Sequence, residues 1–218
     1  MEFDFNKIIY EMAIFSLPIL FALTIREAAH ARMADKLGDT SARAAGRLSL
    51  NPLVHIDPVG TILIPLLMIA LPSNFLFGWA KPAPISESHL NNPRRDIAYV
   101  ASAGLLANFA MAILWMIALK IVTVTISDPA LLKGFSDMAE VGVWFNLFIM
   151  VINFLPLPPF DGGRILSSFL SPSAADKLAK VEPYSFFILL GFIFLGGFEY
   201  FILPLLSVFV ALLTAIFM

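Results

Sequence analysis

Residues 24–39 read "TIREAAHARMADKLGD", and they place several ionisable side chains at the end of a long apolar run. The run itself, "IIYEMAIFSLPILFALTI", covers residues 8–25 and predicts a retained helix that crosses a membrane, because it lacks the features of a cleaved secretory signal. If this helix continues past residue 25, Arg26 and His30 share one face, and Glu27 lies about 100° around the axis from Arg26. The stretch therefore predicts a cluster of ionisable groups at membrane depth.

The composition of the chain is that of an integral membrane protein. Of its 218 residues, 59% are hydrophobic and 14% are charged, and the mean hydropathy is +0.86. We expect an all-α polytopic membrane protein, a single domain over residues 1–218, with about six spanning helices of about 20 residues each in a lipid bilayer. The absence of cysteine excludes disulfides and thiolate metal ligands. The net charge of -2 speaks against nucleic acid as a partner.

Several segments after the first helix have recognisable patterns. Residues 46–58 predict a short strand-bearing or looped element, because Asn51 and Asp57 each precede a proline and are biased to extended conformations. The apolar run at 59–72 is short for a span. Residues 97–126 give the clearest helix, and a further helix from about 141 is ended at about 155 by "PLPPFDGG". The last third predicts two helices broken near Gly196, Gly197 and Glu199.

The orientation of the chain in the membrane stays open at this level. Basic residues occur both at 32–55 and at 78–96, on the two sides of the short apolar run. If that run crosses the membrane, the two basic loops face opposite sides. Cytoplasmic loops are normally the ones enriched in Lys and Arg, so basic loops on both sides do not assign an orientation.

Polar side chains within the apolar runs are the candidates for chemistry, because ionisable groups in hydrocarbon cost several kcal/mol and face a cavity or a partner. Asp161 follows a proline-broken helix, where irregular backbone is tolerated only if it lines a cavity or is buried in protein. Its carboxylate is a candidate metal ligand together with His30. The full set of candidates is Arg26, Glu27, His30, Asn108, Asn153 and Asp161.

Five segments in order, "EAAHARMADKLGD", "GRLSLNPLVHIDPVGTILIP", "FGWAKPAPI", "NPRRDIAYVASAGLLAN" and "NFLPLPPFDGGRIL", carry a family resemblance over residues 24–166. The chain resembles the site-2 protease family (peptidase M50) of intramembrane zinc metalloproteases, in its small prokaryotic type without PDZ or CBS domains. The resemblance implies a multi-pass protein of the cell membrane that hydrolyses peptide bonds in the transmembrane helices of its substrates. It assigns zinc binding to His30 and Asp161 and the general base to Glu27. It assigns substrate or oxyanion positioning to Gly104, Asn108 and Asn153.

Arg26 is the main departure from the family pattern, because it stands where the first histidine of H-E-x-x-H belongs. A guanidinium has no lone pair to donate to a metal and stays protonated. Two protein ligands remain where a catalytic zinc normally has three. His55 is a candidate substitute ligand, although a loop hydrogen bond is the preferred interpretation. A second departure, Leu105 in place of a frequent proline, leaves Gly104 and Asn108 in position.

Three functional hypotheses follow. The first is an intramembrane zinc metalloprotease, impaired by Arg26, in which Glu27 would take a proton from a zinc-bound water. The second is a zinc-free pseudoprotease that still binds transmembrane helices. The third is a transporter or channel in which Arg26, Glu27 and Asp161 form a buried charge network. The sequence lacks the repeated halves and paired broken helices that would support it.

Overall fold

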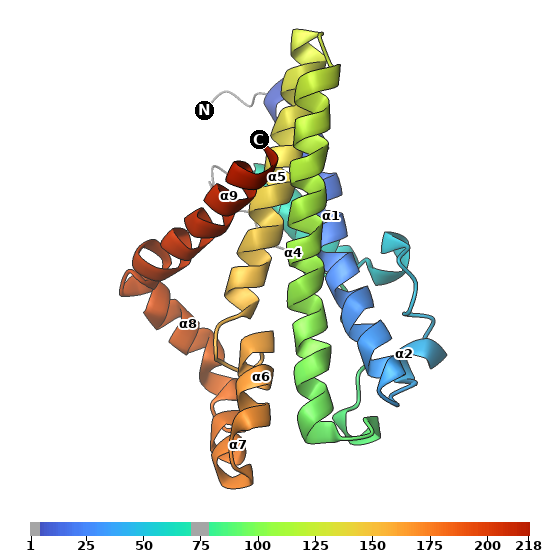
Figure 1. Ribbon diagram of the computed structural model, residues 1–218, viewed down its shortest axis with the longest axis vertical. Helices are drawn as coiled ribbons and strands as arrows, with labels where there is room; N and C mark the ends of the chain where they lie inside the picture. The colour runs from blue at the N-terminus through green and yellow to red at the C-terminus, as the bar shows by residue number, and fades with distance from the viewer. Residues whose placement is uncertain (1–4, 71–78) are drawn as a thin grey trace.

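The computed structural model describes residues 5–70 and 79–218, and the regular secondary structure in this part of the chain is all helical, with no strand (Figure 1). The all-α fold expected from the sequence is therefore confirmed. The α-helices are α1 Phe5–Lys36, α2 Ser41–Ala44, α3 Ile64–Ala70, α4 Pro93–Thr125, α5 Pro129–Asn153, α6 Asp161–Phe169, α7 Pro172–Ala179, α8 Ser185–Phe194 and α9 Leu203–Phe217. Short 3-10 segments are η1 Pro52–His55, η3 Glu87–His89 and η4 Glu182–Tyr184, and π-helical turns are η2 Pro58–Leu63 and η5 Phe198–Ile202.

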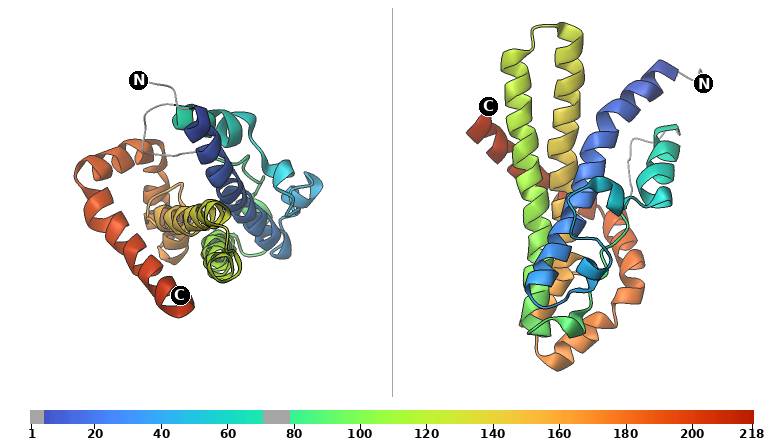
Figure 2. Two further views of the ribbon diagram at one scale, coloured as in Figure 1. Left: turned by 90° about the horizontal axis from the view of Figure 1, so that it is seen from above. Right: turned by 90° about the vertical axis from the view of Figure 1, so that its right-hand side faces the viewer.

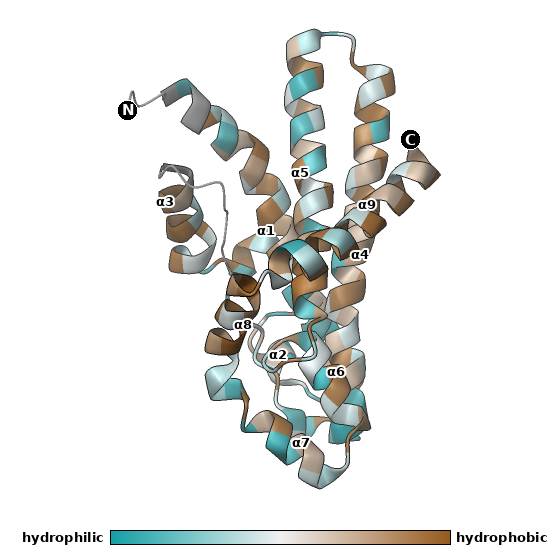
Figure 3. Cartoon of the chain, turned by 90° about the vertical axis from the view of Figure 1, so that its left-hand side faces the viewer, coloured by the Kyte–Doolittle hydropathy of each residue, from teal (hydrophilic) through white to brown (hydrophobic). Residues whose placement is uncertain are grey.

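Four of the described helical segments are long and apolar enough to cross a membrane, where about six spans were expected. They are Ile9–Lys36, Pro93–Thr125, Pro129–Asn153 and Phe198–Phe217. The apolar run at 59–72 gives only the shorter helix Pro58–Met68 within the described residues. Figure 3 shows the hydrophobic colouring of α8 and α9 beside the more hydrophilic end at α7.

Helices α1, α4 and α5 form the centre of the fold, and α8 and α9 lie to one side of it (Figure 2). Buried Leu147 of α5 packs with Ala112 and Met116 of α4 in the main apolar cluster, which α9 joins through Leu206. Gly142 of α5 leaves room for the Trp115 side chain of α4, because a Cβ at position 142 would lie 2.3 Å from its ring. Small residues bring helix backbones close together in membranes, where packing replaces the hydrophobic effect as the driving force.

The ends of the helices follow from local chemistry. Pro93 and Pro129 occupy first-turn positions, where a missing N–H costs nothing. The Asp128 side chain accepts a hydrogen bond from the Leu131 amide and caps α5. Between α8 and η5, Gly196 has φ +84°, a left-handed conformation that favours glycine. The break expected near Gly196 and Gly197 is thus confirmed.

Residues 46–58 form the looped element that the sequence allowed, and a strand is not part of it. The Asn51 side chain accepts from the Leu53 amide, and the Asp57 side chain accepts from the Val59 and Gly60 amides. These short-range bonds satisfy backbone donors within the loop, so a strand ladder is not required.

The two basic loops lie at the same end of the molecule. The Asn91 amide donates to the Leu37 carbonyl over 2.8 Å, and the Ser86 amide donates to Asp39 over 2.7 Å. The segment η2–α3 therefore does not separate these loops onto opposite sides. Helix α7 lies at this end too, while the α4–α5 connection lies at the other (Figure 1).

Candidate peptidase site

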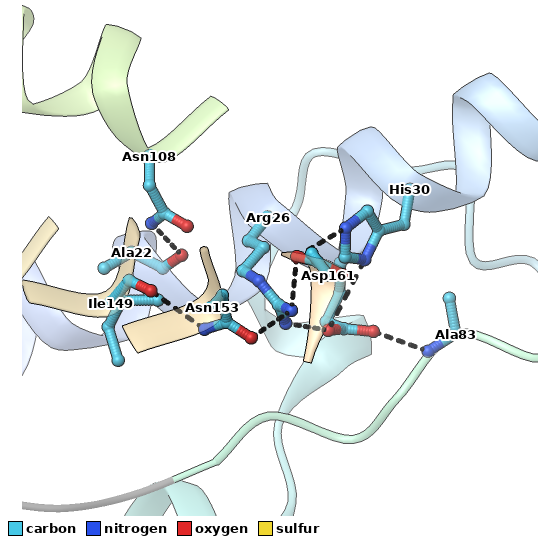
Figure 4. Close-up of polar contacts among 9 residues, drawn as sticks. Ala22, Arg26, His30, Ala83, Asn108, Ile149, Asn153 and Asp161 are labelled. Atoms are coloured by element: carbon cyan, nitrogen blue, oxygen red, sulfur yellow. Dashed lines mark hydrogen bonds and ion pairs between the residues drawn. The ribbon is translucent and has the colours of Figure 1, made fainter. Parts of the chain in front are cut away.

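Three helices bring the predicted polar residues together in the interior (Figure 4). Arg26, Glu27 and His30 lie on consecutive turns of α1, Asn153 is the last residue of α5, and Asp161 is the first residue of α6. The prolines between α5 and α6 end one helix and let the chain turn, so that Asp161 faces α1. The carboxylate of Asp161 is almost fully buried, with 1% of the side chain exposed.

The guanidinium of Arg26 is the centre of this cluster. Its Nη1 donates to Glu27 Oε1 over 2.9 Å, and its Nη2 donates to Asn153 Oδ1 over 2.8 Å and to Asp161 Oδ2 over 2.7 Å. Two of these bonds join opposite charges, and such charge-assisted hydrogen bonds are about twice as strong as neutral ones. Arg26 thereby links α1, α5 and α6.

His30 is buried beside Asp161. Its Nε2 lies 3.3 Å from Asp161 Oδ2 and its Nδ1 lies 4.0 Å from Glu27 Oε1, but Nε2 makes no hydrogen bond within the described residues. Gly104 of α4 packs directly on this ring, because a Cβ at position 104 would lie 1.9 Å from Nε2. Gly104 thus packs against His30, and the substrate or oxyanion positioning that the resemblance implied stays a prediction.

Glu27 is held from two sides. Its Oε1 accepts from Arg26, and its Oε2 accepts from the backbone amide of Ala83 over 2.9 Å. The segment that carries Ala83 continues to Ser86, whose amide donates to Asp39. The stretch from Ala83 to Ser86 is thus fixed to α1 at one point and to the turn after α1 at another.

Asn108 ties the helices together near the site. Its Nδ2 donates to the Ala22 carbonyl over 3.0 Å and to Asn146 Oδ1 over 3.1 Å, and both asparagines are buried. Asn146 was missed in the sequence, although an asparagine two turns before Asn153 on the same apolar helix was the available signal. The pair joins α1, α4 and α5 at a depth where unpaired amides would be costly.

His55 makes the loop hydrogen bond expected of it. The side chain is fully buried, with Nε2 2.9 Å from the Ser49 carbonyl oxygen, and its own carbonyl accepts from the Lys81 amide. Residues 5–70 and 79–218 contain no group of three or more His, Asp or Glu side chains placed to hold a metal ion. His55 therefore does not complete a ligand set with His30 and Asp161.

The residues present do not fit a catalytic zinc ion. Such an ion normally takes three protein ligands and leaves one position for water. Here His30 and Asp161 are the two available donors, and the Arg26 guanidinium bonds to the very carboxylate oxygen that lies near His30 Nε2. The Arg26 cation already neutralises the Asp161 carboxylate that zinc would otherwise bind.

Sequence comparisons give the family. The profile of Peptidase family M50 matches residues 119–196, a range that includes Asn153 and Asp161. YwhC of Bacillus subtilis, provisionally named a zinc metalloprotease, is 34% identical over 174 residues, which are 79% of this chain and 76% of YwhC. Two mycobacterial proteins named Rip2 carry the same provisional description. The protein of Mycolicibacterium smegmatis is 31% identical over 169 residues, and that of Mycobacterium tuberculosis is 29% identical over 171 residues.

The matched regions cover 78% of this chain and 62% of each of these two Rip2 proteins. No solved structure matches the chain significantly. The relationship to YwhC extends over most of both proteins. The chain belongs to peptidase family M50, the site-2 protease family.

Proposed function

We propose that this chain binds transmembrane segments of other proteins in the cell membrane, as a site-2-type protease does, and that Arg26 impairs their hydrolysis. The family and the names of the relatives support the first part. The pairing of Arg26 with Asp161 supports the second, and it is the observation that carries the proposal.

The geometry accounts for the impairment in two ways. Arg26 holds Asp161 in a buried ion pair, and a guanidinium cannot take the place of a histidine ligand. Arg26 also donates a hydrogen bond to Glu27, and the Ala83 amide donates to the second carboxylate oxygen of Glu27. Both oxygens of the residue that would act as general base are therefore already hydrogen-bonded. This arrangement favours a protein that binds transmembrane helices without zinc.

A cavity of about 270 Å³ beside the cluster is suited to an apolar chain. It reaches Arg26 and Glu27 on α1 and is bounded by Ile149 and Ile152 of α5 and by Leu189 of α8. A transmembrane helix that reaches this cavity must unwind locally, because its own hydrogen bonds shield its peptide groups. The polar groups around Arg26 would offer partners to the backbone exposed by that unwinding.

The decisive experiment compares the unaltered chain with Arg26→His after identical purification. We expect little zinc and little cleavage of a transmembrane-segment substrate with Arg26, and a gain of both with the histidine. The double variant Arg26→His with Glu27→Gln is the blank, which should bind zinc without cleaving. Stoichiometric zinc in the unaltered chain, with cleavage above the Glu27→Gln single variant, would contradict the impairment. Failure of Arg26→His to gain zinc would instead contradict the assignment of His30 and Asp161 as ligands.

A further inference from the structure

Two cavities open between α1 and α5, one above the other along the helices. The inner cavity is the one of about 270 Å³ that reaches Arg26 and Glu27. The outer cavity has a volume of about 520 Å³ and lies between α1, α5 and the start of α9. Figure 2 shows these elements from above, with α8 and α9 set apart from α1. The outer cavity is lined mainly by apolar side chains, among them Ile14, Phe15, Trp144, Phe145 and Leu206.

Phe148 and Phe198 line both cavities. Their rings meet edge to face with centroids 6.4 Å apart, so the pair stands where the two cavities adjoin. Phe198 follows Gly196 and Gly197, which interrupt the helical structure between α8 and η5. The two cavities thus form one groove along α5, divided by a pair of aromatic rings and leading to the polar cluster.

Acidic side chains are the ionisable groups in the lining of the outer cavity. Asp137 is already paired, since it accepts from Lys133 over 2.7 Å and from the Tyr10 hydroxyl over 2.5 Å. Glu140 lies one turn further along α5, is exposed, and has no ion pair or hydrogen bond to a side chain in the described part of the protein. An exposed carboxylate without a partner at the edge of an apolar groove is placed to pair with a cation that a docked chain brings to it.

We propose that the outer cavity docks the transmembrane helix of the bound protein, and that this helix carries a Lys or Arg opposite Glu140. The proposal rests on the proposed function and names the class of segment that the site accepts. Glu140 precedes Asn153 by about 13 residues of α5, or about 20 Å of helix axis. The cation of the bound helix would therefore lie about the same distance from the part that reaches Arg26. Charge complementarity and continuity with the inner cavity favour this occupant over a lipid chain.

The test uses the full chain reconstituted in lipid bilayers and synthetic Leu/Ala helices of about 20 residues. One helix has a Lys near one end, a second has Gln at the same position, and both carry a photoreactive residue one turn away. We expect the Lys helix to bind about fivefold to tenfold more tightly and to cross-link to α5 between 137 and 148. Glu140→Gln should abolish the preference for Lys. Glu140→Lys should reverse it in favour of a helix with Glu at that position.

Glu199→Gln is the matched control, because Glu199 is an exposed acid on η5 that lines neither cavity. This variant should keep the preference for Lys. Equal binding of both helices, or a preference that survives Glu140→Gln, would overturn the docking proposal while leaving helix binding intact. Cross-links to Phe109 or Phe209, on another face of α4 and α9, would overturn it as well. Failure of every helix to bind would contradict the proposed function itself. Cross-links between two copies of the chain would overturn the docking proposal, because they would show that a second copy occupies the outer cavity.

Discussion

The guanidinium of Arg26 lies 2.7 Å from the carboxylate of Asp161, although 135 residues separate the two along the chain. Arg26, the main departure from the family pattern, is thus the residue that joins the parts of the site. It neutralises a buried acid where the family would use a metal ion. The predictions below follow from this arrangement and from the packing around it.

The ion pairs of Arg26 should contribute strongly to stability. Arg26→Ala leaves the carboxylate of Asp161 buried without its cation, and breaking such a pair on one side costs about 3–5 kcal/mol. Thermal unfolding in a fixed detergent measures the effect. Arg43→Ala is the control, because Arg43 pairs with Asp35 at the surface, where such pairs contribute about 1 kcal/mol or less. Equal losses for the two variants would show that the buried pair has no special weight.

Gly104 should be intolerant of any side chain. Gly104→Ala places a Cβ 1.9 Å from His30 Nε2, so the histidine must move, and overpacking of this kind costs about 1–3 kcal/mol. In the Arg26→His background, the variant should also lower the zinc content. Gly134→Ala is the matched control, since a Cβ there meets nothing within 4 Å and alanine favours the helix. Full zinc binding by Gly104→Ala would contradict the packing role.

The contribution of Asp39 to the free energy of unfolding should depend on pH. Burial raises the pKa of its carboxyl, but hydrogen bonds from the Ser41 hydroxyl and the Ser86 amide lower that pKa by more. A folded pKa below the unfolded value, about 3.9, means that the stabilisation is present above that value and is lost as the pH falls through the folded pKa. Asp39→Asn should therefore be less stable than the unaltered chain at pH 7, by about 1–2 kcal/mol.

The difference between Asp39→Asn and the unaltered chain should shrink in acid. Unfolding measured at neutral pH and again below about pH 4 tests this, because protonation removes the advantage of the aspartate. A difference that stays constant over this range would show that the charge of Asp39 is not what its hydrogen bonds stabilise.

The structure also predicts the orientation in the membrane. The end that holds α2, the start of α4 and α7 carries many basic residues, whereas the opposite end, at the α4–α5 connection, has Lys120 and Lys133. Cytoplasmic loops are enriched in Lys and Arg, so the first end should face the cytoplasm. The basic residues at that end include Lys36, Arg43, Arg47, Arg94, Arg95, Lys177 and Lys180.

Single cysteines test this orientation cleanly, because the chain contains none of its own. Ser173→Cys on α7 should react with an impermeant thiol reagent only when the cytoplasmic face is accessible. Ser127→Cys, between α4 and α5, should react in intact cells. Both serines are exposed. The opposite labelling pattern would invert the assignment.

The sequence by itself determined the class of the protein and much of its local structure. Hydropathy predicted membrane-spanning helices, and the prolines after 155 and the glycines at 196 and 197 marked breaks that the structure contains. These features depend on short stretches of chain, where the cost of burying polar groups and the limits on backbone angles act locally. The motif also indicated which polar side chains to consider together, since residues four apart on a helix share a face.

Only the tertiary structure decided how those side chains meet. The bonds of Arg26 to Asn153 and Asp161, the contact of Gly104 with His30, and the Asn108–Asn146 pair each join different helices. The packing of the two basic loops at one end is settled in the same way. Such contacts depend on the relative placement of whole helices, which close packing of many side chains fixes together and which no short stretch of sequence specifies.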